Sequence, residues 1–300
     1  MKRLFTFGCS YTEYHWPSWA DLIGTEFDYF ENWGVRGIGN RGIAERISEC
    51  HMTHNFTKDD TIIVQWSTHL RFDWYKEVPG PDHREAGWKT CGSIFAYYNS
   101  KIFDKKWIDL FFSEPAYMMH TFNHIGLVQG LLESTGCTWY MTSIGDLRNA
   151  GADITVSNLF KEYSIHSNFE HKNTIIQDHY PHFKFYEEAI WDRYSSHWLK
   201  PIHLFSNESH DKYWWFREDE QSSWRETHPS ITHYRNWIFT ELKDKISLST
   251  TTLSEIDKIT DSIEDLKQSS FDFVNFIEEL HKNNFYRPDK FSWPRIVYGF

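Results

Sequence analysis

The chain has 300 residues and a formal net charge of −11 at neutral pH. This length is enough for one large α/β domain with insertions or for two modest domains, and it can bury a full hydrophobic core. The negative charge provides no positive field to hold phosphates, which excludes a general binder of nucleic acid or of anionic membranes.

The four cysteines are widely spaced and none belongs to a C-x-x-C pair: Cys9, Cys50, Cys91 and Cys137. This spacing is typical of reduced thiols in a cytoplasm, and it contains no zinc pattern. The chain passes from Met-Lys-Arg into a strand of about five residues, which is shorter than the apolar core of a signal peptide. No window reaches the ~20 apolar residues of a membrane helix. We therefore expect a soluble, cytoplasmic protein without a membrane partner.

Aromatic residues make up 18% of the chain, with 15 Trp, 16 Tyr and 24 Phe. One interpretation is that Trp and Tyr build a core that is short of Ile, Leu and Val. The other is that some of them line a groove for sugars or other flat, hydroxylated ligands, because aromatic faces with polar rims suit such ligands.

Residues 4–19 carry the first chemical signal. Leu4–Phe7 is a short apolar run that predicts a buried strand, and a helical pattern opens at Trp16. The tight turn between them contains Gly8 and Ser10. This order places the Ser10 hydroxyl at the carboxyl edge of an α/β sheet, where such folds bind ligands. Ser10 is then either a cap of the next helix or a nucleophile.

The strand and helix pattern then repeats. Alternation predicts a second strand over 27–33, helical spacing predicts a helix over 41–54, and 61–66 is a continuous, β-branched strand of the kind that parallel sheets prefer. With the first strand and helix this makes a β-α-β-α-β order, which predicts an α/β fold with a parallel sheet and right-handed crossovers.

Three later segments have equally clear patterns. Apolar spacing predicts a long helix over 117–134, a fourth strand over 138–143, and a further helix over 229–246.

Two long segments between these elements are irregular and rich in aromatic residues. We interpret 70–116 and 145–225 as insertions beside the carboxyl edge of the sheet, the second with short helical pieces near 157–163 and 184–198. One α/β domain over 1–246 would then carry both insertions.

The C-terminal part has a different composition. Residues 247–252 are predicted as a linker, and 253–300 as a helical extension with an acidic, amphipathic stretch. Its apolar face packs either on the main domain or on a second subunit, so these helices are a candidate surface for a homo-oligomer.

A second candidate chemical group lies before the last predicted helix of the domain. Thr227-His228-Pro229 contains one of 17 histidines, and proline suits the first turn of a helix. His228 is then held by the backbone and points outward. It is either a capping or surface histidine, or a base.

The two groups together resemble a known family. Gly8-Cys9-Ser10-Tyr11-Thr12 after the first strand and Thr227-His228-Pro229 before a late helix resemble the first and last sequence blocks of the SGNH (GDSL-type) hydrolases. The loop 32–37 is similar to the second block, and strand 61–66 falls where the third block follows. The Trp-Pro-Ser-Trp-Ala-Asp-Leu pattern resembles versions common in phage and environmental sequences.

This resemblance implies a three-layer α/β/α sandwich of the flavodoxin-like type and a serine esterase without a cofactor. Ser10 would attack the carbonyl carbon of an ester and His228 would take its proton. The backbone N–H groups of Ser10 and Gly37 would hold the oxyanion. The expected substrate is a small acyl ester, such as an acetyl group on a carbohydrate.

The chain departs from the family pattern in the first and third blocks. Cys9 stands where the family has Asp. The third-block Asn has no direct match, and His69 falls at its place when residues are counted from the strand. Ser67, Thr68 and Asn40 are rival donors, or the donor is absent and activity is weak.

The acid of the triad is also displaced. The family acid usually lies three residues before the histidine, where this chain has Arg225. Glu226, two residues before His228, reaches the imidazole if the loop is bent. Otherwise a backbone carbonyl orients the ring and leaves a dyad.

A metal site is not expected from the sequence. His51-x-x-His54 and a later group lack a complete ligand spacing with a fourth partner; that group comprises His166, His171, Asp178, His179 and His182. Arg71 and Trp74, just past the third strand, are either substrate contacts or ordinary rim residues.

Two rival functions follow from the same residues. The missing Asn and displaced acid suit a non-catalytic carbohydrate-binding or structural protein on a hydrolase frame. An O-acyltransferase would use the same nucleophile and base, but pass the acyl group to a sugar instead of water.

Overall fold

The computed structural model describes residues 1–76, 87–94, 103–145, 147–150, 174–175, 184–202, 228–270 and 273–283. Within these ranges the central sheet has four strands in the order β2-β1-β3-β6, and every neighbouring pair is parallel. The strands are β1 (Arg3–Phe7), β2 (Tyr29–Asn32), β3 (Asp60–Trp66) and β6 (Thr138–Ser143). This confirms the predicted α/β class and the parallel sheet.

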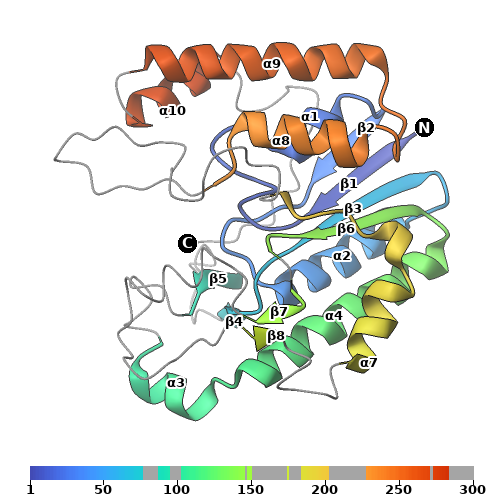
Figure 1. The fold of residues 1–300 in the computed structure, drawn as a ribbon, viewed down its shortest axis with the longest axis vertical. Coiled ribbons are helices and arrows are strands. Elements are labelled where there is room, and N and C mark those ends of the chain that lie inside the picture. The colour runs from blue at the N-terminus through green and yellow to red at the C-terminus, as the bar shows by residue number, and fades with distance from the viewer. Residues whose placement is uncertain are drawn as a thin grey trace, which may run out of the picture.

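Helices cover both faces of this sheet (Figure 1). One face carries α2 (Asn40–His54) and α4 (Glu114–Thr135). The other carries α1 (Trp19–Gly24), α8 (Ile231–Trp237), α9 (Thr250–Ser269) and α10 (Phe273–Lys282).

The alternation of side chains along the strands makes two cores. Phe5 and Phe7 of β1 and Val64 of β3 face α2 and α4, while Leu4 and Ile63 face α1 and α8. Because both faces are covered, these strands are apolar throughout, as expected for a parallel sheet.

The tryptophans account for much of this packing. Among the described residues, five tryptophans are at most 1% exposed: Trp16, Trp19, Trp66, Trp139 and Trp237. Trp19 packs edge-on against Trp237 at a ring separation of 5.5 Å, which joins α1 to α8. For these residues the aromatic content serves the core.

The segment 70–116 is more regular than the sequence indicated. Its described part contains β4 (Arg71–Lys76) paired antiparallel with β5 (Gly87–Ser93), followed by α3 (Lys105–Phe111). The expectation of an irregular insertion is therefore wrong for these stretches. Aromatic residues such as Phe72 and Phe103 build a small separate core there, which the mixed polar pattern concealed.

The second insertion is described only in part. β7 (Asn149–Ala150) pairs with β8 (Thr174–Ile175), and the predicted piece near 157–163 lies outside the described residues. The piece near 184–198 forms α7 (Lys184–Tyr186), a π-helical segment and a 3₁₀ turn (Ser195–His197).

The boundaries near the C-terminus differ from the prediction. α8 begins after Pro229, because Ser230 is the N-cap and accepts a hydrogen bond from the backbone N–H of His233. A π-helical segment, Ile238–Leu242, continues α8. The predicted linker is shorter, since Ser249 caps α9 and residues 250–252 are already helical.

The C-terminal helices pack on the main domain. Ile256 and Ile263 of α9 and Phe276 of α10 are fully buried in the core that contains Trp16 and Tyr234. Of the two predicted alternatives, the apolar face of 253–282 therefore meets its own chain. Within the described ranges, no helix is both long and apolar enough to span a bilayer.

Gly8, directly after β1, is predicted to be irreplaceable. A Cβ atom there would lie 2.1 Å from Thr12 Oγ1 and 3.0 Å from the Gln65 carbonyl oxygen. Gly8→Ala should lower the free energy of unfolding by about 2 kcal/mol or more, measured by urea denaturation.

Gly126→Ala is the control, because a Cβ atom in this exposed part of α4 meets nothing within 4 Å. This change should raise the free energy of unfolding by about 1 kcal/mol. Equal effects of the two changes would contradict the prediction.

Candidate active site

Ser10 lies in a tight turn at the carboxyl end of β1. The carbonyl oxygen of Cys9 accepts hydrogen bonds from the backbone N–H groups of Thr12 at 2.9 Å and Glu13 at 3.0 Å. The Thr12 hydroxyl donates to Gln65 Oε1 at 2.8 Å, which ties the turn to β3. The turn therefore fixes the backbone on both sides of Ser10, which is 6% exposed.

His228 meets this serine across a long sequence separation. Its Nε2 lies 2.8 Å from Ser10 Oγ, within hydrogen-bond distance, although the residues are 218 positions apart. The neighbouring Pro229 carbonyl accepts a hydrogen bond from Trp16 Nε1 at 3.1 Å. Trp16 thus links the start of α8 to the segment that follows Ser10.

The His228 ring is also held through its face. Tyr14 stacks on it with a centroid separation of 3.7 Å and an angle of 21° between the rings, and Tyr11 approaches edge-on at 5.5 Å. The Arg36 guanidinium lies over the Tyr14 ring at 5.3 Å and pairs with Glu13 at 3.1 Å. Packing therefore restricts the rotation of the imidazole in addition to the hydrogen bond with Ser10.

A buried carboxylate supports the segment between Ser10 and α1. Asp21 accepts hydrogen bonds from the backbone N–H of Ser18 at 2.9 Å and from Asn32 Nδ2 at 3.3 Å. Asn32 and the Ser18 hydroxyl both donate to the Thr12 carbonyl oxygen. Burial raises the pKa of Asp21 to about 6, although the hydrogen bonds from Ser18 and Asn32 oppose this shift.

A second buried carboxylate holds the loop after β2. Asp73 of β4 accepts hydrogen bonds from the backbone N–H groups of Gly39 at 2.9 Å and Gly42 at 2.9 Å, at the start of α2. Burial raises its pKa to about 6, against the effect of these two donors. Gly37 in the same loop has a φ of +76°, a left-handed conformation that favours glycine.

The predicted donors after β3 have different surroundings. The Asn40 side chain donates to the Ser67 carbonyl at 3.0 Å and to Thr121 Oγ1 at 3.2 Å, and accepts from the Ser67 N–H at 2.7 Å. These bonds give the Asn40 amide a positioning role after β3, and its role as an oxyanion donor stays a prediction. The buried hydroxyls of Ser67 and Thr68 have no hydrogen-bond partner among the described residues, and His69 is half-buried.

Several other predicted residues lie outside the described residues. These are Arg225, Glu226, His166, His171, Asp178, His179 and His182. The roles proposed for them, including Glu226 as the acid of the triad, remain predictions.

Arg71 and Trp74 take structural positions. Arg71 Nη1 donates to the Ile38 carbonyl at 3.1 Å, so it helps to hold the loop before α2. Trp74 packs edge-on against Phe103 at 6.2 Å in the small core of the first insertion. These contacts give both residues a structural role, and a further contact with substrate stays a prediction.

Sequence reasoning missed Tyr14 and Asp73. Tyr14 lies only four residues after Ser10, but nothing in its local pattern shows that it will stack on a ring 214 positions away. Asp73 carried one weak signal, a lone acidic residue in an aromatic β pattern, where an unpaired charge would be costly to bury.

No family model and no curated protein matches the chain. Among solved structures, it is similar to the crystal structure of protein YXIM from Bacillus subtilis, with 11% sequence identity and a TM-score of 0.33. The match covers 94% of this chain and 57% of that one, so this chain spans little more than half of that protein's length. The sheet and the site themselves define an α/β protein with a serine and a histidine paired at the carboxyl end of β1.

The raised pKa of Asp73 predicts a particular dependence of stability on pH. As the pH falls through about 6, the Asp73 carboxyl takes up a proton in the folded chain, whereas in the unfolded chain it stays ionised to a lower pH. Lower pH therefore favours the folded state, and the Asp73 contribution to stability decreases as the pH rises through about 6. Asp73→Asn removes that titration. The free energy of unfolding of the variant, relative to wild type, should therefore be lower at about pH 5 than at about pH 7.

Urea denaturation at both pH values measures this difference. Ser134→Ala, at an exposed serine of α4 without a titratable group, is the control and should differ from wild type by the same amount at both pH values. If the stability difference between Asp73→Asn and wild type is also the same at both pH values, the prediction is contradicted.

Proposed function

We propose that this chain is a serine ester hydrolase of the SGNH type, built on the three-layer α/β/α sandwich of that family. The observation that carries the proposal is the 2.8 Å contact between Ser10 Oγ and His228 Nε2. A serine hydroxyl is a weak nucleophile until a base accepts its proton, and this distance suits that transfer. The resemblance of the Ser10, loop 32–37 and His228 segments to the SGNH blocks supports the same function.

The proposed reaction uses these two side chains in turn. Ser10 Oγ attacks the carbonyl carbon of an ester as His228 Nε2 takes the hydroxyl proton. The His228 imidazolium then gives this proton to the departing alcohol, which leaves an acyl group on Ser10. Water, deprotonated by His228, attacks the acyl carbon, and His228 then returns this proton to Ser10 Oγ as the carboxylic acid leaves.

The developing oxyanion needs fixed donors. We assign this role to the backbone N–H groups of Ser10 and Gly37, with His69 and the Ser67 hydroxyl as further donors. The turn after β1 fixes Ser10, and the Asp73 hydrogen bonds to Gly39 and Gly42 hold the loop that contains Gly37. Such preorganised donors stabilise charge without reorganising during the reaction.

Tyr14 has a proposed role in positioning the base. In a triad a third group orients the histidine, and here the Tyr14 ring lies against the imidazole face at 3.7 Å. Glu226 is proposed as the acid that completes the triad from the segment just before His228. Tyr14 would limit the tilt of the imidazole and Glu226 its rotation in the ring plane.

The proposed substrate is a small acyl ester, with an O-acetylated carbohydrate as the favoured class. The aromatic content of the chain supports this choice, because aromatic faces suit hydroxylated rings. The acyl group would lie against Ser10, while the alcohol part would extend over the residues beyond the carboxyl edge of the sheet.

Ser10→Ala should reduce hydrolysis of an aryl acetate by at least about 10³-fold, because the nucleophile is removed while the turn keeps its backbone hydrogen bonds. Circular dichroism should show an unchanged fold. A fluorophosphonate probe should label wild type at Ser10 and leave the variant unlabelled. Ser134→Ala, at an exposed serine near the end of α4, is the control and should keep both activity and labelling. Wild-type activity in the Ser10→Ala variant would disprove the assignment.

Replacing the Tyr14 ring should lower the turnover number more than it changes the KM. Tyr14→Leu removes the stacking surface, and a misplaced base costs roughly 10²-fold in kcat. Tyr14→Phe keeps the ring and should stay close to wild type. Steady-state kinetics of both variants against one aryl ester checks this. Equal losses in the two variants would show that the hydroxyl, and not the stacked ring, matters.

A further inference from the structure

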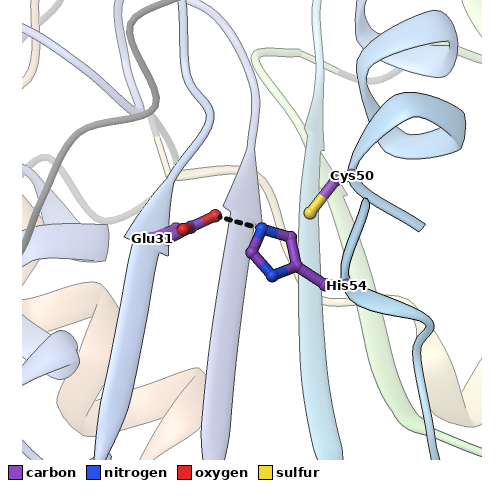
Figure 2. A group of neighbouring side chains, drawn as sticks. All are labelled: Glu31, Cys50 and His54. Atoms are coloured by element: carbon purple, nitrogen blue, oxygen red, sulfur yellow. Dashed lines mark ion pairs between the residues drawn. The ribbon is translucent and has the colours of Figure 1, made fainter. Parts of the chain in front are cut away.

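Three side chains of different chemistry converge between α2 and the sheet. Glu31 comes from β2, and Cys50 and His54 come from α2 (Figure 2). Cys50 and His54 are four residues apart, which places them on the same face of the helix one turn from each other. One ligand atom from each of the three residues lies within 4.8 Å of the other two.

These side chains are withdrawn from solvent. Cys50 is fully buried, Glu31 is 6% exposed and the His54 side chain is 19% exposed. The carboxylate of Glu31 pairs with His54, whose Nε2 lies 3.0 Å from Oε2. A buried carboxylate is costly unless a positive charge faces it, and His54 supplies one only when its ring is protonated.

The surrounding residues orient Glu31. Trp33 Nε1 donates to Oε2 at 2.7 Å, and the Tyr29 hydroxyl donates to Oε1. The Phe5 ring lies 5.0 Å from the His54 ring and also packs against Phe56. A ligating carboxylate that is itself hydrogen-bonded and lies in an apolar shell is typical of metal sites.

Cys50 does not fit the alternative of a reactive thiol. Its side chain is fully buried and lies near the Glu31 carboxylate. Reactive cysteines lie instead in exposed, electropositive surroundings that lower the thiol pKa.

We propose that Glu31, Cys50 and His54 form a binding site for a zinc ion. Zinc takes sulfur, imidazole nitrogen and carboxylate oxygen together, and three protein ligands leave one tetrahedral position for water. The ion would bind His54 through Nε2, so the ring would carry its hydrogen on Nδ1. The Cys50 thiol would lose its proton to solvent.

The charges of such a site balance. One dication with the Glu31 carboxylate, the Cys50 thiolate and a neutral imidazole has no net charge, which a buried location tolerates. Bond lengths of about 2.0 Å to nitrogen and oxygen and about 2.3 Å to sulfur imply ligand separations of roughly 3.5 Å. The longer separations, up to 4.8 Å, would therefore contract by roughly 1 Å around the ion, while the 3.0 Å contact between Glu31 and His54 would widen slightly.

The position of this site separates it from the candidate active site. α2 starts at Asn40, beside Ser67 at the carboxyl edge of the sheet, and its rise places His54 about 20 Å further along the helix. The ion would link the last turns of α2 to β2, away from Ser10. This inference does not rest on the proposed esterase function, and loss of the metal should leave Ser10 labelling by fluorophosphonate unchanged.

Metal binding to the wild-type chain is the first test. The chain is treated with a chelator, dialysed against Zn²⁺, and its metal content is measured by elemental analysis. We expect one ion per chain and a higher melting temperature with zinc than without it. Co²⁺ in place of zinc should give a sulfur-to-cobalt charge-transfer band and the strong visible bands of a tetrahedral site. A folded wild-type chain that binds no zinc, or a cobalt spectrum without the sulfur band, would overturn the proposal.

Variants locate the ion. Cys50→Ser should abolish the sulfur band and the zinc-dependent rise in melting temperature. Cys137→Ser, at another buried free cysteine, should keep both. If Cys50→Ser fails to fold, Tyr29→Phe serves instead, because it removes only the hydroxyl that orients Glu31 and should weaken zinc binding by roughly tenfold or more. His51→Ala tests the neighbouring histidine and should retain binding. Unchanged zinc affinity in Tyr29→Phe together with a lost sulfur band in Cys137→Ser would refute this location.

Discussion

The pairing of β1 with a strand on each side is the constraint on which the rest of the structure depends. β1 lies between β2 and β3, and its side chains alternate between two separate cores. It therefore cannot shift by one residue without exchanging the contents of the two cores. This fixed register determines where the chain leaves the sheet, and hence where Ser10 lies. Gly8 is required at that exit because the turn passes close to β3.

Two buried aspartates extend this order from the sheet to the loops. Asp21 supports the segment after Ser10, and Asp73 supports the loop that begins α2. In both cases burial disfavours the charged carboxylate while backbone N–H groups favour it, and burial has the larger effect on the pKa. The loops around the candidate site are thus held by hydrogen bonds that are sensitive to pH, although neither aspartate belongs to the proposed catalytic pair.

The two proposed sites use opposite ends of the same crossover. The start of α2 contributes Asn40 and the neighbouring glycines to the carboxyl edge of the sheet, beside the proposed esterase site. The last turns of α2 contribute Cys50 and His54 to the proposed zinc site. A zinc link between α2 and β2 would restrain the helix whose first residues hold the loop with Gly37. The sites would then be separate in chemistry but share one structural element.

The sequence by itself determined the elements whose pattern is local. The buried run 61–66, the helical spacing of 41–54 and the strand 138–143 are recognisable because their periodicity and composition belong to neighbouring residues. The serine in its glycine turn and the histidine before a proline were also visible locally. Only the tertiary structure decided that Tyr14 stacks on His228, that Asp73 holds the start of α2, and that the Asn40 amide bonds to Ser67. It also decided that Glu31 pairs with His54 and that Cys50 lies beside them. Each of these contacts joins residues from different elements or depends on the direction of a side chain, which no local pattern specifies.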